Sequence, residues 1–153
     1  MPLLPFAGGQ LEYLATGSGQ PVTVFAHGLA GSIAETRPLA SAVAGTRVFL
    51  HFRGHGASSA PESPWIYPAL AAELAAVADY AGATRAVGVS LGAGALTTLL
   101  ADQPARFERL VFFLPAVLDQ PRRDAALDRL RAMARHVDDR DVAVEGRERA
   151  GEG

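Results

Sequence analysis

The alternation of short apolar runs with helical patterns is the feature that most constrains the fold. Runs rich in β-forming residues are followed by stretches with helical periodicity, and a run apolar on both faces is typical of a strand buried inside a parallel sheet. The expected strands cover residues 10–16, 22–26, 47–52, 85–89 and 110–114, and the expected helices cover 33–44, 67–80 and 91–101. This order predicts an α/β fold: a mostly parallel sheet with helices on both faces.

The helix expected over 67–80 has the clearest boundaries, because Leu70, Leu74 and Val77 fall on one face and Gly82 can close it. Pro104 ends the apolar helix of 91–101, and Pro38 must lie near the first turn of the helix of 33–44. In such sheets, ligands bind beyond the carboxyl ends of the strands, so candidate site residues are sought there.

Composition excludes several classes of protein and site. A chain of 153 residues is long enough for one domain, and the net charge of −2 argues against a nucleic-acid partner or an anionic membrane surface. Without cysteine there is no thiolate for a metal site or a nucleophile, and we expect no metal. We also expect no cofactor, because no strand is followed by G-x-G-x-x-G and the chain lacks the lysine of a P-loop.

The start of the sequence, MPLLPFAGGQ, lacks the basic segment of a secretory signal. The uncharged stretch of 86–101 is shorter than the ~20 residues that a spanning helix needs. We therefore expect a soluble, cytoplasmic protein without a membrane partner.

The strand of 85–89 leads into Gly88-Val89-Ser90-Leu91-Gly92, which is a G-x-S-x-G pattern at a strand-to-helix junction. A serine in such a sharp turn exposes its hydroxyl, and Gly88 and Gly92 let strand and helix pass closely. The positive end of the following helix favours negative charge at the serine. Ser90 is therefore a candidate nucleophile, and the alternative is a glycine-rich turn that only packs a helix onto the sheet.

The strand of 22–26 is followed by His27-Gly28-Leu29, in a loop of small residues whose backbone N–H groups can face the site. The N–H groups of Leu29 and Leu91 are the expected donors of an oxyanion hole, which stabilises the negative oxygen formed when a carbonyl is attacked. We expect His27 to organise the loop through hydrogen bonds rather than to act as a base.

Together, His27-Gly28, Arg53-Gly54-His55-Gly56 with Ser58, and the pattern around Ser90 resemble the α/β-hydrolase fold superfamily. More narrowly, the chain resembles the small esterase, lactonase and non-haem peroxidase-like members of that superfamily, and the resemblance covers roughly residues 10–118. The resemblance implies Ser90 as nucleophile, Leu29 and Leu91 at the oxyanion hole, and a small-molecule carbonyl substrate. Ser rather than Asp at position 90, in the sharp turn between strand and helix, argues against dehalogenase and epoxide hydrolase chemistry. The chain has His51 where the family usually has Asp, which changes the hydrogen bonding of that loop.

The resemblance also implies an acid and a histidine after later strands. Here the strand pattern ends at residue 114. His136 is the one histidine after Ser90, and it falls on or just past an amphipathic helical pattern that covers 124–137, so we expect it to face solvent. Asp119 follows the strand of 110–114, where a minority of family members place the acid, but we expect it to be a loop residue. A serine without a base is expected to be a very poor catalyst.

Charge is distributed unevenly: thirteen of the thirty charged residues precede residue 119. We interpret residues 1–118 as the N-terminal part of the hydrolase core, 119–141 as the start of a helical cap, and 142–153 as a disordered or non-native tail. The favoured hypothesis is a hydrolase truncated before its acid and histidine; the alternative is a non-catalytic fragment or binding protein that retains the fold. The strand of 110–114 would then be an uncovered sheet edge, which predicts self-association.

Overall fold

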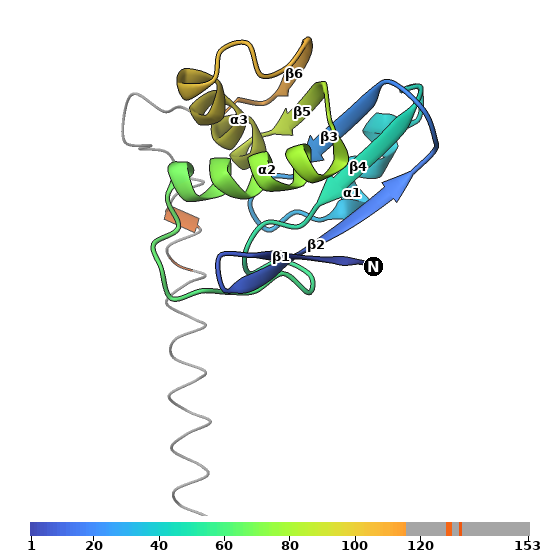
Figure 1. Ribbon diagram of the computed structural model, residues 1–153. Coiled ribbons are helices and arrows are strands. Elements are labelled where there is room, and N and C mark those ends of the chain that lie inside the picture. Colours follow the sequence, from blue (N-terminus) through green and yellow to red (C-terminus); the bar gives the residue numbers. More distant parts are fainter. Residues whose placement is uncertain (116–127, 130–131, 133–153) are drawn as a thin grey trace, which may run out of the picture. The chain divides into compact units, whose positions relative to one another are not determined.

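The computed structural model describes residues 1–115, 128–129 and 132. Its sheet has six strands in the order β1-β2-β4-β3-β5-β6 (Figure 1). β3, β4, β5 and β6 are parallel, whereas β1 pairs with β2 and β2 with β4 in antiparallel register. The strands are β1 (Leu3–Phe6), β2 (Gly9–Thr16), β3 (Val22–Ala26), β4 (Thr46–Leu50), β5 (Arg85–Val89) and β6 (Arg109–Phe113). The mostly parallel α/β architecture expected from the sequence is confirmed.

Helices cover both faces of the sheet. The helices are α1 (Ile33–Thr36), the 3₁₀ helix η1 (Arg37–Ala40), α2 (Tyr67–Ala81) and α3 (Leu91–Asp102). One core cluster joins Val24, Val48 and Ala86 of the strands to α2 and α3. A smaller one joins Phe25 and the neighbouring strand residues to α1 and η1, on the opposite face (Figure 1). Because successive strand residues point to opposite faces, the fully buried β3 serves both clusters.

Two elements differ from the sequence-based expectation. The helix expected over 33–44 is shorter: α1 ends at Thr36, and a 3₁₀ turn that contains Pro38 near its start follows to Ala40. Proline has no N–H for a helical hydrogen bond, so a regular α-helix does not continue through this position. β1 was not expected at all, because only four residues form it and Pro5 lies inside it.

The other expected elements are present with small shifts at their ends. β4 covers Thr46–Leu50 rather than 47–52, and β6 covers Arg109–Phe113 rather than 110–114. α2 ends one residue later than expected, and Gly82 follows it in the left-handed conformation with φ 66°. The predicted capping glycine is thus confirmed.

The chain divides into two compact units, Met1–Ala116 and Val117–Gly153. The predicted amphipathic segment of 124–137, the cap segment of 119–141 and the tail of 142–153 lie outside the described residues, apart from 128–129 and 132. Within the part of the chain that is described, no helix is long and apolar enough to cross a membrane.

Candidate active site

Ser90 occupies the turn between β5 and α3 with φ 47° and ψ −103°. This conformation is unfavourable for a residue with a Cβ and costs about 1–3 kcal/mol. Backbone hydrogen bonds on both sides hold it: the Ser90 N–H donates to Phe113 O of β6 at 2.9 Å, and the Gly94 N–H donates to Ser90 O at 3.0 Å. Neighbouring structure therefore maintains the strained turn.

Glycines allow the close approach of strand and helix at this turn. A Cβ at Gly88 would lie 2.7 Å from Gly92 O, and one at Gly92 would overlap the carbonyl oxygen of Ala26 in β3. The Gly92 N–H donates to His27 O at 3.1 Å, which joins α3 to the end of β3. These contacts agree with the steric reason given for the two glycines from the sequence.

The loop after β3 runs beside Ser90. A Cβ at Gly28 would lie 3.5 Å from the Cβ of Ser90, so the two backbones are close. Ala30 has φ 56°, which turns the loop sharply. Within residues 1–115, the backbone N–H groups of Leu29 and Leu91 donate to no protein acceptor. Both amides thus keep their hydrogen-bonding capacity near the serine.

Three histidines at this edge of the sheet share one hydrogen-bonding pattern. The Nε2 atoms of His27, His51 and His55 accept the backbone N–H groups of Phe52, Ile33 and Ala30, at 3.1, 2.9 and 3.2 Å. A nitrogen that accepts an amide N–H carries no proton, so each ring is the neutral tautomer with its proton on Nδ1. The Nδ1 atoms then donate to Gly28 O, Glu12 Oε2 and Arg53 O.

His27 is fully buried, with its ring centroid 4.6 Å from that of His55. Burial lowers the pKa of His27 to about 4, because a charged imidazole would lose its hydration. With both nitrogens bonded to backbone groups, His27 has no lone pair free for a base. The role of His27 as an organiser of the loop stays a prediction.

His51 pairs with a carboxylate that the sequence analysis missed. Glu12 of β2 is 7% exposed, and its Oε2 accepts from His51 Nδ1 at 2.7 Å and from the Ala57 N–H at 2.9 Å. The Ala57 hydrogen bond lowers the pKa of the Glu12 carboxyl, against the opposing effect of burial, and His51 lowers it further. A Cβ at Gly56 would overlap both side chains of the pair. The alternating pattern of β2 gave no signal for this pair, because finding it requires the register of β2 against β4.

Arg53 and Glu73 form a second buried pair. Arg53 donates to Glu73 of α2 from both its Nε and its backbone N–H. Its Nη1 donates to Ser63 Oγ and Pro64 O. This pair fastens the loop after β4 to the helix layer.

The expected site residues Ser90, Leu29, Leu91, His27, Gly28, Gly88 and Gly92 therefore gather at the carboxyl edge of β3 and β5. Among the described residues, no histidine hydrogen-bonds to Ser90 Oγ. Asp119 and His136 lie outside the described residues. Two cavities have volumes of about 220 and 420 Å³; Arg53 lines the first, and Ser90 lines neither of them.

A family model described as the alpha/beta hydrolase fold matches residues 21–150, which is most of the chain. The chain belongs to this family. A comparison with functionally described proteins found no match.

Solved structures of α/β hydrolases superpose on the chain. One from Sphaerobacter thermophilus is 31% identical with a TM-score of 0.69, over 88% of this chain and 55% of its own. Est816, an N-acyl homoserine lactone degrading enzyme, is 26% identical with a TM-score of 0.62, over 72% of this chain and 44% of its own. The enol-lactonase from Burkholderia xenovorans is 25% identical with a TM-score of 0.64, over 71% of this chain and 45% of its own. This member of the family thus spans about half the length of the structures it matches.

Proposed function

We propose that this chain carries the nucleophile half of a serine hydrolase that acts on an ester, lactone or related small carbonyl compound. Ser90 is the proposed nucleophile, and the N–H groups of Leu29 and Leu91 are the proposed oxyanion hole. The observation that carries the proposal is the conformation of Ser90, since a strained serine between strand and helix serves no packing purpose that a glycine would not serve better. The similarity to a lactone-degrading enzyme and an enol-lactonase supports the substrate class.

We propose in addition that turnover by this chain is impaired. The three described histidines use both ring nitrogens on other groups, so residues 1–115 offer Ser90 no base. Loss of the histidine in a serine protease lowers kcat by about 10⁶. The same observation favours the second candidate function, a non-catalytic fragment or binding protein that retains the fold.

Chemical rescue separates the two candidates. We expect the Ser90 hydroxyl to react with a fluorophosphonate probe. Hydrolysis of p-nitrophenyl acetate should be slow but should rise with added imidazole, which supplies the base that residues 1–115 do not offer. Ser90→Ala should abolish the labelling. It should also lower the imidazole-dependent rate of hydrolysis to the rate that imidazole gives without the protein. Ser41→Ala, at an exposed serine outside the site, should change neither.

Equal rates for the chain and Ser90→Ala at every imidazole concentration, without labelling, would support the non-catalytic candidate. Fast Ser90-dependent turnover without imidazole would support the hydrolase and contradict the impairment.

We also propose that the chain associates with itself through β6. Among the described strands β6 pairs with β5 alone, and all five of its residues are exposed. Four of them, Leu110, Val111, Phe112 and Phe113, are large and apolar. Such an edge leaves unpaired backbone groups beside apolar side chains, which favours pairing with a second copy.

A further inference from the structure

A row of arginines crosses the sheet at the end opposite to Ser90. Thr23 of β3 is in register with Arg47 of β4 on one side and with Arg85 of β5 on the other. Arg85 is in register with Arg109 of β6. Residues paired across neighbouring strands point to the same face, so these four side chains form one row, which we call the arginine row.

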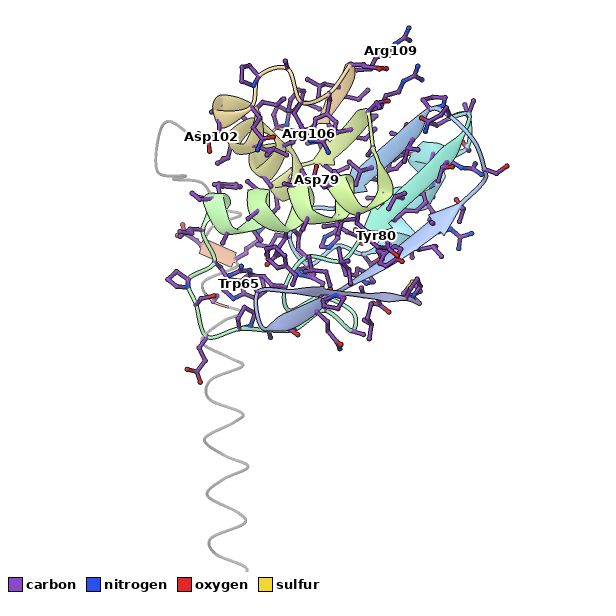
Figure 2. The ribbon with its side chains drawn as sticks, in the orientation of Figure 1. Trp65, Asp79, Tyr80, Asp102, Arg106 and Arg109 are labelled. Atoms are coloured by element: carbon purple, nitrogen blue, oxygen red, sulfur yellow. The ribbon has the colours of Figure 1, made fainter. Side chains whose placement is uncertain are left out.

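The arginine row lies on the face that carries α1 and η1. The next residues on that face, two positions along each strand, are Phe49, Phe25 and Val87, which belong to the smaller core cluster. Phe25 and Phe49 stack with ring centroids 4.8 Å apart. The arginine row therefore begins where this cluster ends, at the amino ends of the parallel strands, and Arg109 extends outward from its open side (Figure 2).

The arginine row has no acidic partner within the described residues. Two ion pairs there join Arg53 to Glu73 and Arg106 to Asp79, and the Glu12 carboxylate accepts a hydrogen bond from His51. Arg106 and Asp79 are paired on the helix side, at a distance from Arg109 (Figure 2). Among the described residues, Arg47, Arg85 and Arg109 are thus three positive charges in one row without a negative partner, an arrangement that repulsion disfavours unless an anion is present.

Three polar atoms in the same row are buried without a hydrogen-bond partner. They are Thr23 Oγ1, Arg47 Nε and Arg85 Nε, and they are all the buried side-chain atoms of this kind in the described part of the chain. Thr23 itself is only 3% exposed. A buried donor without an acceptor destabilises the folded chain, so the concentration of these atoms in one row indicates an acceptor that binds there.

We propose that Arg47, Arg85 and Arg109, with the hydroxyl of Thr23, form a binding site for a polyvalent oxyanion, such as a phosphate or a group of neighbouring carboxylates. Guanidinium groups bind both through paired N–H···O hydrogen bonds, and an oxyanion would accept the free Nε–H and hydroxyl donors. The row extends over four neighbouring strands about 4.8 Å apart, with Thr23 between Arg47 and Arg85, so a polyvalent anion fits it better than a single chloride. The site lies at the opposite end of the strands from Ser90, so it is independent of the proposed function.

Thermal unfolding of the full chain tests the proposal with two probes at constant ionic strength, set with NaCl. Inorganic phosphate represents a free anion, and a hexaglutamate peptide represents the carboxylates of a polypeptide segment. At ten times its dissociation constant, a bound probe should raise Tm by about 4 °C. A rise with phosphate identifies a small anion as ligand, and a rise with the peptide alone identifies an acidic segment.

Arg47→Met and Arg85→Met, which keep the apolar stem, should each lose most of the rise. Arg37→Met removes the same charge at an exposed arginine of η1 outside the row, and it should keep the rise. If the first two variants do not fold in NaCl, Arg109→Met at the exposed edge and Arg85→Lys should each show a smaller rise than the unsubstituted chain. No rise with either probe, or an equal rise in all variants, would overturn the proposal.

Discussion

Single residues at the carboxyl edge of the sheet act mainly as hydrogen-bond partners for loops. His27, His51 and His55 each accept a backbone N–H that would otherwise lack a partner in the loops after β3 and β4. They do so only in the neutral state, since a protonated imidazole has no lone pair left to accept. The order of the loop beside Ser90 therefore depends on these rings staying unprotonated.

Stability should fall in weak acid because of His27. Its pKa is lowered from 6.5 to about 4, so its contribution is complete above pH 6.5 and is lost as the pH falls toward 4, where only the unfolded chain binds the proton. The loss amounts to about 3 kcal/mol by pH 4. His27→Gln, which can also donate and accept, should remove this part of the pH dependence. Urea unfolding between pH 7 and 4 measures the free energy of unfolding. If that free energy depends on pH in the variant as it does in the unsubstituted chain, groups other than His27 cause the dependence.

Glu12 should add a separate acid dependence at lower pH. Its pKa in the folded chain is lowered, so its contribution is present above the ordinary carboxyl value near 4.5 and is lost as the pH falls through the lowered value. Glu12→Gln removes the charge that binds the Ala57 N–H and His51, and should cost about 1.5–3 kcal/mol at pH 7. Exposed Glu35, substituted in the same way, serves as control. Equal unfolding midpoints for the two variants at pH 7 would contradict the importance of the Glu12–His51 pair.

At the scale of elements, two glycines at helix ends have different physical reasons. Gly92, in the first turn of α3, would bring a Cβ into the Ala26 carbonyl. Gly82, after α2, has open space around it but a φ of 66°. The first is a steric constraint between two elements, and the second is a constraint on one residue's backbone.

Alanine substitution should distinguish these reasons. Helix propensity favours Ala over Gly by about 1 kcal/mol, yet we expect Gly92→Ala to destabilise the chain by about 2–3 kcal/mol because α3 must move away from β3. Gly82→Ala should cost about 1–2 kcal/mol, the penalty for the left-handed conformation alone. Chemical denaturation measures both. A stabilised Gly92→Ala variant would mean that α3 is not held against the end of β3.

The elements themselves were largely predictable, and the side-chain pairs between them were not. The strands and α2 were found because alternating or helical spacing of apolar residues reflects burial within one segment. β1 was missed because its exposure alternates only weakly over four residues. The helix predicted over 33–44 was too long, because α1 ends at Thr36 and Pro38 follows its first turn. Ser90 and its glycines lie within five residues and could be predicted as a unit. Glu12 and His51 lie on β2 and just past β4, so nothing local joins them.

At the scale of the whole molecule, the open side of the sheet at β6 should govern behaviour in solution. We expect self-association that rises with protein concentration, and Val111→Lys should reduce it, because a charge on an edge strand disfavours pairing with another copy. Leu39→Lys places the same charge at an exposed leucine of η1 and should not reduce it. Light scattering after size-exclusion chromatography measures the mass. A monomer at all concentrations, with cooperative unfolding, would contradict this expectation.

The hydrogen bond from the Ser90 N–H to Phe113 O also affects the order in which the chain folds during its synthesis. A chain made on the ribosome grows from its amino terminus, and its domains generally form in that order. β3, β4, β5 and the three histidine rings can assemble before β6 is made, but the Ser90 turn receives its β6 partner only after residue 113 has emerged. During synthesis, the serine turn should therefore be among the later parts of this sheet to become rigid, although Ser90 is made well before β6.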